Sequence, residues 1–196
     1  MEAVHKLRKM RIGVVGLGYV GLPLAVAFGE AGHDVVGYDV DQERVALLGG
    51  GESDIEDVDS ARLAALGERF AATTDAAELG PCEAILICVP TPLAAEREPD
   101  LTYVRESTET IATILRPGQL VVLESTTYPG TTREELLPVL ERGGMKVGED
   151  FHLAYSPERI DPGRSDHQIA TTPKVVGGMT PACVERATAV YSEVCN

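Results

Sequence analysis

The feature that most constrains this chain is the run RIGVVGLGYVGLPLAVAFGEAGHDVVGYD, which occupies residues 11–39. It starts with a short apolar stretch, passes through three glycines in the spacing GxGxxG, and ends in an acid after a second apolar stretch. A strand, a glycine turn, a helix, a second strand and an acid in this order form a dinucleotide-binding unit. We therefore predict a strand over 11–15, a helix from about Tyr19 or Val20, and Asp39 at the tip of the next strand.

Each residue of the unit has a predicted physical role. Gly16 permits the tight turn, Gly18 lets the backbone approach a pyrophosphate, and Gly21 lets the helix lie close to the strand. The amides at the start of the helix face the phosphates, where the helix dipole favours negative charge. Asp39 can accept hydrogen bonds from the ribose hydroxyls and repels a 2′-phosphate, which favours NAD over NADP. Arg44 keeps NADP open as the alternative, because a nearby arginine can neutralise that phosphate.

Composition bounds the class of protein. The 196 residues, 44% of them hydrophobic, suit one domain with its own core. A net charge of -14 argues against nucleic acid and against an anionic membrane surface as partners. The uncharged stretch 12–29 contains five glycines and a proline, which argues against a membrane segment. The four cysteines form no CxxC and no metal-ligand spacing with the histidines, so we expect no metal site, reduced thiols and a cytoplasmic location.

The rest of the chain alternates apolar runs with helical patterns. Residues 1–10 are expected to be a charged, frayed lead, and residues 11–196 to form the domain. The apolar runs predict strands over 11–15, 34–38, 69–73, 84–89, 119–124, 151–156 and 174–178. Helical patterns follow from about residue 20, over 42–48, 59–69 and 75–79, from about 101, from about 132, and over 181–195. We expect helix caps at Asp41, Asp100, Thr131 or Thr132, and Thr180, and buried thiols at Cys88 and Cys183.

Because the strands are apolar throughout, we predict a doubly wound α/β fold of the Rossmann type, with a mostly parallel sheet and helices on both faces. Ligands in such sheets bind beyond the carboxyl ends of the strands. The loops there hold GLGYVG, the acid Asp39, PTP at 90–92, ESTTYPGTT at 124–132 and SPERIDPG at 156–163.

Taken together, these motifs resemble the UDP-glucose/GDP-mannose dehydrogenase family of nucleotide-sugar 6-dehydrogenases, over residues 11–194. The form SPERIDPG is similar to that of members that oxidise UDP-N-acetylglucosamine or UDP-N-acetylmannosamine. Members that act on UDP-glucose usually carry a second glutamate four residues after the first, and here that position, counted from Glu158, is Pro162.

The resemblance implies an NAD-dependent oxidation of a sugar C6 hydroxyl to a carboxylate, through an aldehyde and a cysteine-bound thioester, with two NAD reduced per sugar. It implies that Thr126 positions a catalytic water and that Glu158 acts as general base and also lies by the cofactor. On the residues alone, Thr126 as a turn hydroxyl and Glu158 as a surface or arginine-paired acid fit equally well. The implied cofactor-binding residues are Gly16, Gly18, Tyr19, Val20 and Gly21 at the pyrophosphate, Asp39 and Arg44 at the ribose, Val89, Pro90 and Thr91 in the groove, and Ser125 and Thr126 at the nicotinamide.

The chain departs from the family in length. Members also carry a central helix with a catalytic lysine and asparagine, a glycine-rich segment with the nucleophilic cysteine, and a second, UDP-binding domain, and these 196 residues contain none of them. Cys195 lacks a glycine-rich flank and is not assigned as the nucleophile. We therefore expect a cofactor-binding half that cannot complete catalysis alone, with the UDP-sugar bound mostly by the absent domains and a homodimer formed at full length. Two alternatives stay open, an NAD(P)-dependent oxidoreductase of the hydroxyacid dehydrogenase type and a non-catalytic nucleotide-binding subunit.

Overall fold

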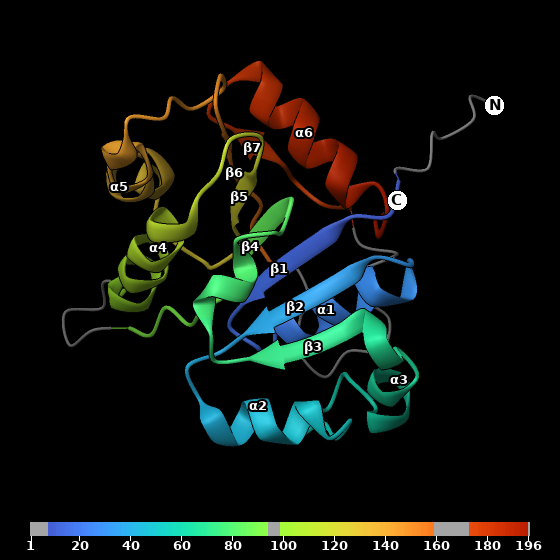
Figure 1. The fold of residues 1–196 in the computed structure, drawn as a ribbon. Coiled ribbons are helices and arrows are strands. Elements are labelled where there is room, and N and C mark those ends of the chain that lie inside the picture. The colour runs from blue at the N-terminus through green and yellow to red at the C-terminus, as the bar shows by residue number, and fades with distance from the viewer. Residues whose placement is uncertain (1–7, 94–98, 159–172, 196) are drawn as a thin grey trace.

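The computed structural model describes residues 8–93, 99–158 and 173–195, and a sheet runs through them (Figure 1). Its strand order is β3-β2-β1-β4-β5-β6-β7. Every neighbouring pair from β3 to β6 is parallel, and β7 pairs antiparallel with β6. The predicted doubly wound, mostly parallel sheet is confirmed. The strands are β1 (Arg11–Val15), β2 (Asp34–Tyr38), β3 (Phe70–Thr73), β4 (Ala84–Ile87), β5 (Leu120–Leu123), β6 (His152–Tyr155) and β7 (Gly177–Gly178).

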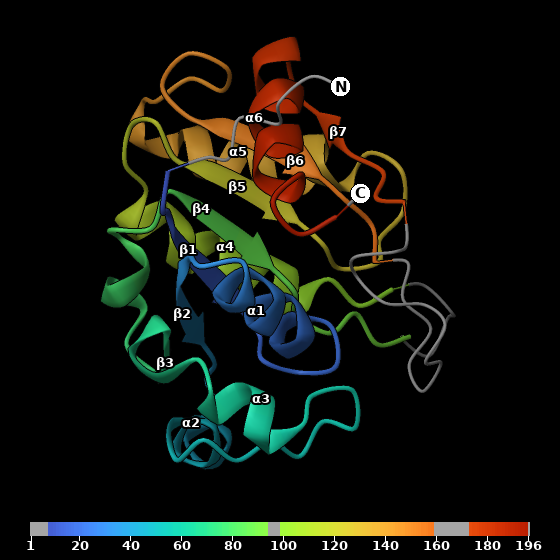
Figure 2. The same ribbon diagram turned by 90° about the vertical axis from the view of Figure 1, so that its right-hand side faces the viewer.

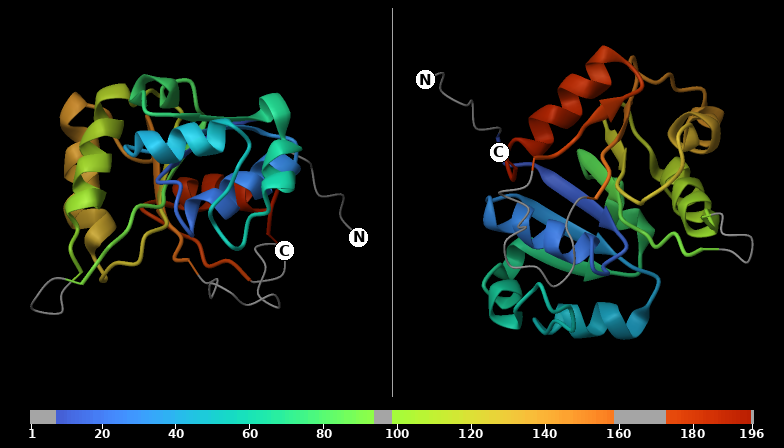
Figure 3. Two further views of the ribbon diagram at one scale, coloured as in Figure 1. Left: turned by 90° about the horizontal axis from the view of Figure 1, so that it is seen from below. Right: turned by 180° about the vertical axis from the view of Figure 1, so that it is seen from behind.

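Helices cover both faces of this sheet (Figures 1 and 2). The α-helices are α1 (Gly21–Glu30), α2 (Gln42–Gly49), α3 (Ser60–Ala64), α4 (Thr102–Ile114), α5 (Leu137–Leu140) and α6 (Pro181–Tyr191). Short 3₁₀ turns occupy Gly67–Arg69, Ala76–Leu79 and Glu141–Gly143, and a π-helical turn spans Thr132–Leu136. Figure 3 shows α2 and α3 together beyond β3, at the edge of the sheet away from α6.

Two hydrophobic cores, one on each face, explain why the strands carry no polar side. In β4, Ala84 and Leu86 join the core under α1 and α6, whereas Ile85 and Ile87 join the core under α4 and α5. All four are fully buried. A strand buried on both faces must be apolar at successive positions, which is the pattern read from the sequence.

Several local predictions are confirmed. Asp41 caps α2 by accepting from the N–H groups of Glu43 and Arg44. Thr180 caps α6, with Pro181 in the first turn. Cys88 and Cys183 are buried free thiols.

Other local predictions are wrong. Neither Thr131 nor Thr132 caps the following helix. Thr131 Oγ1 donates to the Tyr128 carbonyl at 2.8 Å, and Thr132 is already the first residue of a π-helical turn. Asp100 lies one residue before the N-cap Leu101, although it still accepts from the Thr102 N–H at 2.9 Å. The strand predicted over 84–89 ends at Ile87, because its partners β1 and β5 end at the same register.

The start and the end of the domain also differ from expectation. Met10, assigned to a frayed lead, is buried, and its N–H donates to His33 Nδ1 at 3.2 Å. The strand predicted over 174–178 is reduced to the two glycines of β7. Most of SPERIDPG, including Pro162, lies outside the described residues. Within the described ranges, no helix combines the length and apolar character needed to cross a bilayer.

Candidate functional site

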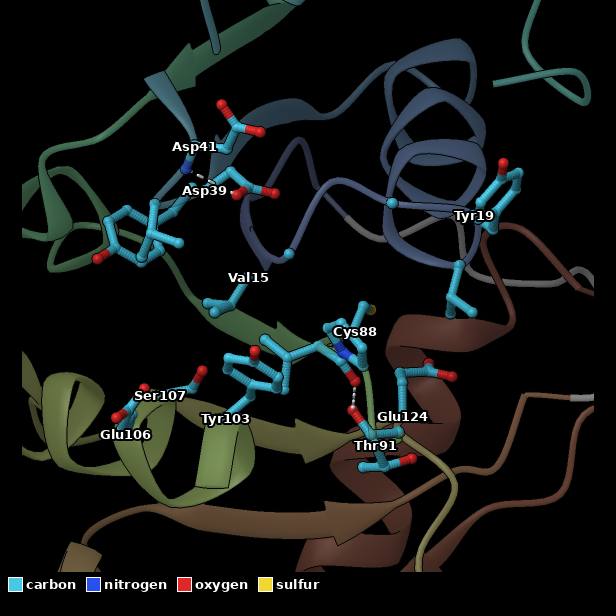
Figure 4. Close-up of a pocket in the computed structure, with 18 of the residues that line it drawn as sticks. Val15, Tyr19, Asp39, Asp41, Cys88, Thr91, Tyr103, Glu106, Ser107 and Glu124 are labelled. Atoms are coloured by element: carbon cyan, nitrogen blue, oxygen red, sulfur yellow. Dashed lines mark hydrogen bonds between the residues drawn. The ribbon is translucent and has the colours of Figure 1, made fainter. Parts of the chain in front are cut away.

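A cavity of about 620 Å³ opens at the carboxyl ends of the parallel strands (Figure 4). With one exception, the residues predicted for the site line it. They are Gly16, Gly18, Tyr19, Val20, Asp39, Arg44, Val89, Pro90, Thr91, Ser125, Thr126 and Glu158. The exception, Gly21, lies beneath the turn that forms one wall. The sheet therefore brings five separate sequence segments to one opening.

The three glycines of the turn are needed for different reasons. Gly16 has a φ of +88°, and its N–H donates to the Tyr38 carbonyl at 2.8 Å, which joins the turn to β2. A Cβ at Gly21 would lie 1.8 Å from the Gly16 carbonyl oxygen, so this glycine serves close packing between α1 and the turn. A Cβ at Gly18 would meet no other residue within 4 Å. The protein itself therefore gives no reason for a glycine at position 18, and the free space belongs to the cavity.

The N-terminus of α1 faces the same space. Its first turn contains no acidic residue, and the N-cap Val20 makes no side-chain hydrogen bond to the helix. The first amides of a helix have no intrahelical acceptor, and the helix dipole places partial positive charge there. Together with the open side of Gly18, this end of α1 offers main-chain donors to an anion.

Asp39 follows β2 and is fixed by the backbone around it. Its Oδ2 accepts from the Leu17 N–H at 2.8 Å. Its Oδ1 accepts from the Asp41 N–H at 3.1 Å (Figure 4). Each carboxylate oxygen can accept more than one hydrogen bond, so both retain capacity for a ligand hydroxyl. Arg44, on α2, donates from Nη1 to the Leu17 carbonyl at 3.2 Å. Its guanidinium also forms a two-point ion pair with Asp54, at 2.9 and 3.0 Å.

One face of α4 forms a wall that the sequence analysis missed. Tyr103, Glu106, Ser107 and Thr110 all line the cavity. Their spacing of three, four and seven residues places them on one side of the helix. Val104 and Ile111 of the same helix are buried in the core. The polar stripe at the same period was the signal that could have found this wall.

Two hydrogen bonds join the loops after β4 and β5. Ser125 Oγ donates to the Val89 carbonyl at 2.6 Å, and Thr91 Oγ1 donates to the Thr126 carbonyl at 2.8 Å. Both bonds run between residues predicted for the site. They hold the two loops at a fixed separation along the cavity, while Thr126 itself stays exposed.

Beneath Ser125 lies a buried charge cluster, which we define as Glu124, Lys174, Tyr191 and Glu158. Glu124 is 0% exposed and lines the cavity. Its Oε2 lies 2.5 Å from Lys174 Nζ, and its Oε1 accepts from the Tyr191 hydroxyl. The Lys174 ammonium is also 3.9 Å from Glu158 Oε2 and 5.2 Å from the centre of the Tyr191 ring. Glu158 is tied to the cluster a second time by its N–H, which donates to the Glu124 carbonyl at 3.4 Å.

Electrostatics in the cluster follow from burial and charge. Burial raises the pKa of the Glu124 carboxyl, against the opposing attraction of Lys174. Burial would lower the pKa of Lys174, but the two carboxylates beside it prevail and raise that pKa. The pKa of the Cys88 thiol is raised by burial and by Glu124, so this pocket thiol stays protonated and is a poor nucleophile. Sequence analysis missed the cluster because its members are up to 67 positions apart.

Among the residues that the structure describes, no three His, Cys, Asp or Glu side chains are grouped so that they could hold a metal ion.

Comparisons with known proteins agree on one family. Residues 10–195 match the profile of the "UDP-glucose/GDP-mannose dehydrogenase family, NAD binding domain". The chain is 41% identical over 189 residues to UDP-N-acetyl-D-glucosamine 6-dehydrogenase of Pseudomonas aeruginosa, covering 96% of this chain and 44% of that protein. It is 40% identical over 191 residues to UDP-N-acetyl-D-mannosamine dehydrogenase of Escherichia coli K12, covering 92% and 44%. A solved UDP-D-ManNAc dehydrogenase from Pyrococcus horikoshii superposes with a TM-score of 0.89 at 35% identity, covering 95% and 45%. The chain thus spans less than half the length of these relatives.

Proposed function

We propose, from the premise that this chain belongs to the UDP-glucose/GDP-mannose dehydrogenase family and is its NAD-binding domain, that the cavity at the strand ends is where NAD binds. One observation carries the proposal. The unfilled space over Gly18, the uncapped start of α1 and the Asp39 carboxylate all face a single cavity. Those are the donors, the room and the acceptor that a diphosphate joined to a ribose requires.

At one end, Asp39 accepts hydrogen bonds from the adenosine ribose, and Arg44 lies beside it. Main-chain donors of Gly18, Tyr19 and Val20 hold the diphosphate, because backbone amides can bind phosphate even in a protein of net charge -14. Gly16 shapes the turn, and Gly21 acts by letting α1 approach it. The residues present therefore fit the cofactor without a lysine.

Val89, Pro90 and Thr91 line the groove toward the other end, where Ser125 and Thr126 lie by the nicotinamide. When bound, NAD supplies the acceptor for a hydride from the substrate carbon. Glu158 serves as general base toward a water that Thr126 helps to position. The support is geometric, since both residues line the cavity and Lys174 lies 3.9 Å from Glu158 and can hold its carboxylate.

The whole protein is proposed to oxidise the C6 hydroxyl of a UDP-sugar to a carboxylate with two NAD, through a thioester on a cysteine outside this chain. A UDP-N-acetylhexosamine is the favoured substrate and UDP-glucose the next, because the relatives at 40% and 41% identity are named for the N-acetyl sugars. Residues 11–196 would then form one cofactor domain, completed by a central helix and a UDP-binding domain, and assembled as a homodimer.

Calorimetric titration of this chain with NAD tests the cofactor proposal. We expect saturable binding of one NAD per chain and weaker binding of NADP. A folded sample that gives no saturable heat at millimolar NAD would contradict the proposal.

The substrate proposal is tested with the full-length protein. Reduction of NAD should follow addition of UDP-N-acetylglucosamine or UDP-N-acetylmannosamine, with two NADH formed per sugar. Turnover of a 3-hydroxyacid in their place would favour the hydroxyacid dehydrogenase type. Binding of NAD with no turnover of any UDP-sugar would favour a non-catalytic subunit.

A further inference from the structure

We propose that Asp54 is a residue that selects NAD over NADP, because it occupies the Arg44 guanidinium that would otherwise bind a 2′-phosphate. The proposal rests on the proposed function, since it concerns the same cofactor. Asp54 belongs to the loop between α2 and α3 and does not line the cavity.

Positively charged side chains are scarce among the described residues that line the cavity. Of the described residues that line the cavity, Arg44 alone carries a positive charge, whereas its charged companions are acids. These acids are Asp39, Asp41, Glu106, Glu124 and Glu158. A 2′-phosphate would bring further negative charge to this cavity, and Arg44 is the lining side chain that could compensate it.

The guanidinium is close to the ribose position but already engaged. Leu17 links it to Asp39, since the Leu17 N–H donates to Asp39 Oδ2 at 2.8 Å while the Leu17 carbonyl accepts from Arg44 Nη1 at 3.2 Å. Asp54 takes Nη1 and Nη2 together, at 2.9 and 3.0 Å. Carboxylate and phosphate both bind the same two-pronged edge of a guanidinium. Asp54 therefore occupies the Nη1–Nη2 edge of Arg44, on which a 2′-phosphate could otherwise bind.

The pair is also suited to selectivity more than to stability. The Arg44 side chain is 23% exposed and that of Asp54 is 50% exposed. Ion pairs at such sites contribute little to folding. Replacing Asp54 should thus leave the fold intact and free the guanidinium to turn toward a ligand.

The experiment measures the affinities of NAD and NADP by calorimetry for Asp54→Asn and Asp54→Ala. Because Asp39 also repels a 2′-phosphate, each change is made in the native chain and in Asp39→Asn. We expect Asp39→Asn/Asp54→Ala to bind NADP about tenfold more tightly than Asp39→Asn alone, the effect of one regained charge-assisted contact. NAD affinity should change by less than about threefold between the same two proteins. Adding Arg44→Gln should abolish the gain for NADP.

Glu30→Ala is the control, because Glu30 also forms a two-point pair, with Nε and Nη2 of Arg62 at 3.0 and 3.0 Å, but lies outside the cavity. It should not alter the ratio of the two affinities. Equal NADP affinity with and without Asp54 would overturn the inference, as would a gain that survives Arg44→Gln. Failure of the native chain to bind NAD would instead refute the proposed function.

Discussion

At the Asp39 end of the cavity, the groups that face a ligand are held by main-chain hydrogen bonds and one exposed ion pair. At the Glu124 end, by contrast, a carboxylate, an ammonium and a phenol are buried against one another. The first arrangement holds binding groups at little cost in desolvation, whereas the second is favourable only while every charge keeps its partner. Substitutions at the Asp39 end should therefore alter binding first, and those at the Glu124 end should alter folding first.

The largest effect should come from Lys174→Met, which leaves Glu124 buried without its cation. We expect the free energy of unfolding at neutral pH to fall by about 3–5 kcal/mol, measured by urea denaturation. Lys9→Met is the control, because the ion pair of Lys9 with Asp34 is exposed and should contribute less than about 1 kcal/mol. If the two variants lost similar free energies of unfolding, the buried charges at the Glu124 end would not contribute more to folding than an exposed ion pair.

That loss should depend on pH. Burial already raises the pKa of Glu124, and removing Lys174 takes away the charge that opposes this rise. The folded variant then binds a proton that the unfolded chain does not bind, so its stability should recover as the pH falls toward about 4.3, the ordinary pKa of a glutamate. Denaturation of both proteins across pH 5 to 8 measures the difference. A constant difference would show that Glu124 does not titrate in the variant.

At the Asp39 end, Asp39→Ala should weaken NAD binding by about 1–3 kcal/mol, because the ribose hydroxyls lose their acceptor. Asp34→Ala, at the other end of β2, is the control and should leave NAD binding unchanged. Calorimetry measures both. If NAD binds the Asp39 variant as tightly as the native chain, the ribose is held elsewhere.

A smaller effect is expected for Gly18→Ala. The added Cβ touches no protein atom, so stability should hold or rise by about 0.4–1 kcal/mol, yet it enters the space assigned to the diphosphate. We expect NAD affinity to fall about tenfold, which corresponds to about 1.4 kcal/mol. Gly49→Ala on α2 also adds a Cβ in open space and should leave NAD affinity unaltered. An unaltered affinity in the Gly18 variant would place the diphosphate away from this turn.

The smallest effect should come from Thr91→Val, which removes the hydrogen bond to the Thr126 carbonyl between two exposed loops. We expect a loss of about 0.5–1.5 kcal/mol in stability and a similar or smaller loss in NAD binding. Thr113→Val on α4 is a control, since Thr113 does not line the cavity and its hydroxyl bonds within the helix to the Thr110 carbonyl. A loss of several kcal/mol in stability for Thr91→Val would mean that folding depends on these loops as strongly as on the buried charges at the Glu124 end.

Where the determinants are local, the sequence predicted the structure well. The GxGxxG spacing located β1, the turn and α1, and the Asp41 and Thr180 caps located the starts of α2 and α6. Residues immediately after the strands were correctly expected at one opening, since parallel strands end at the same edge.

Determinants that depend on distant partners were missed. Glu124 was read as the last residue of an apolar strand, and nothing in its neighbourhood indicates Lys174 or Tyr191 as partners. The end of β4 at Ile87 depends on where two other strands end. The Thr131 hydroxyl can either cap a helix or bond to a nearby carbonyl, and the loop geometry places the Tyr128 carbonyl within its reach.

The hydrogen bond from Tyr191 to Glu124 has a consequence for synthesis of the chain. As the polypeptide emerges from the ribosome, the glycine turn and Asp39 appear early, but Tyr191 of α6, a partner of the cavity residue Glu124, follows Asp39 about 150 residues later. Until then Glu124 is a carboxylate at the end of a hydrophobic strand, without the Tyr191 hydroxyl and the Lys174 ammonium as partners. The Glu124 side of the cavity should thus be fixed only in the last stage of translation of this domain.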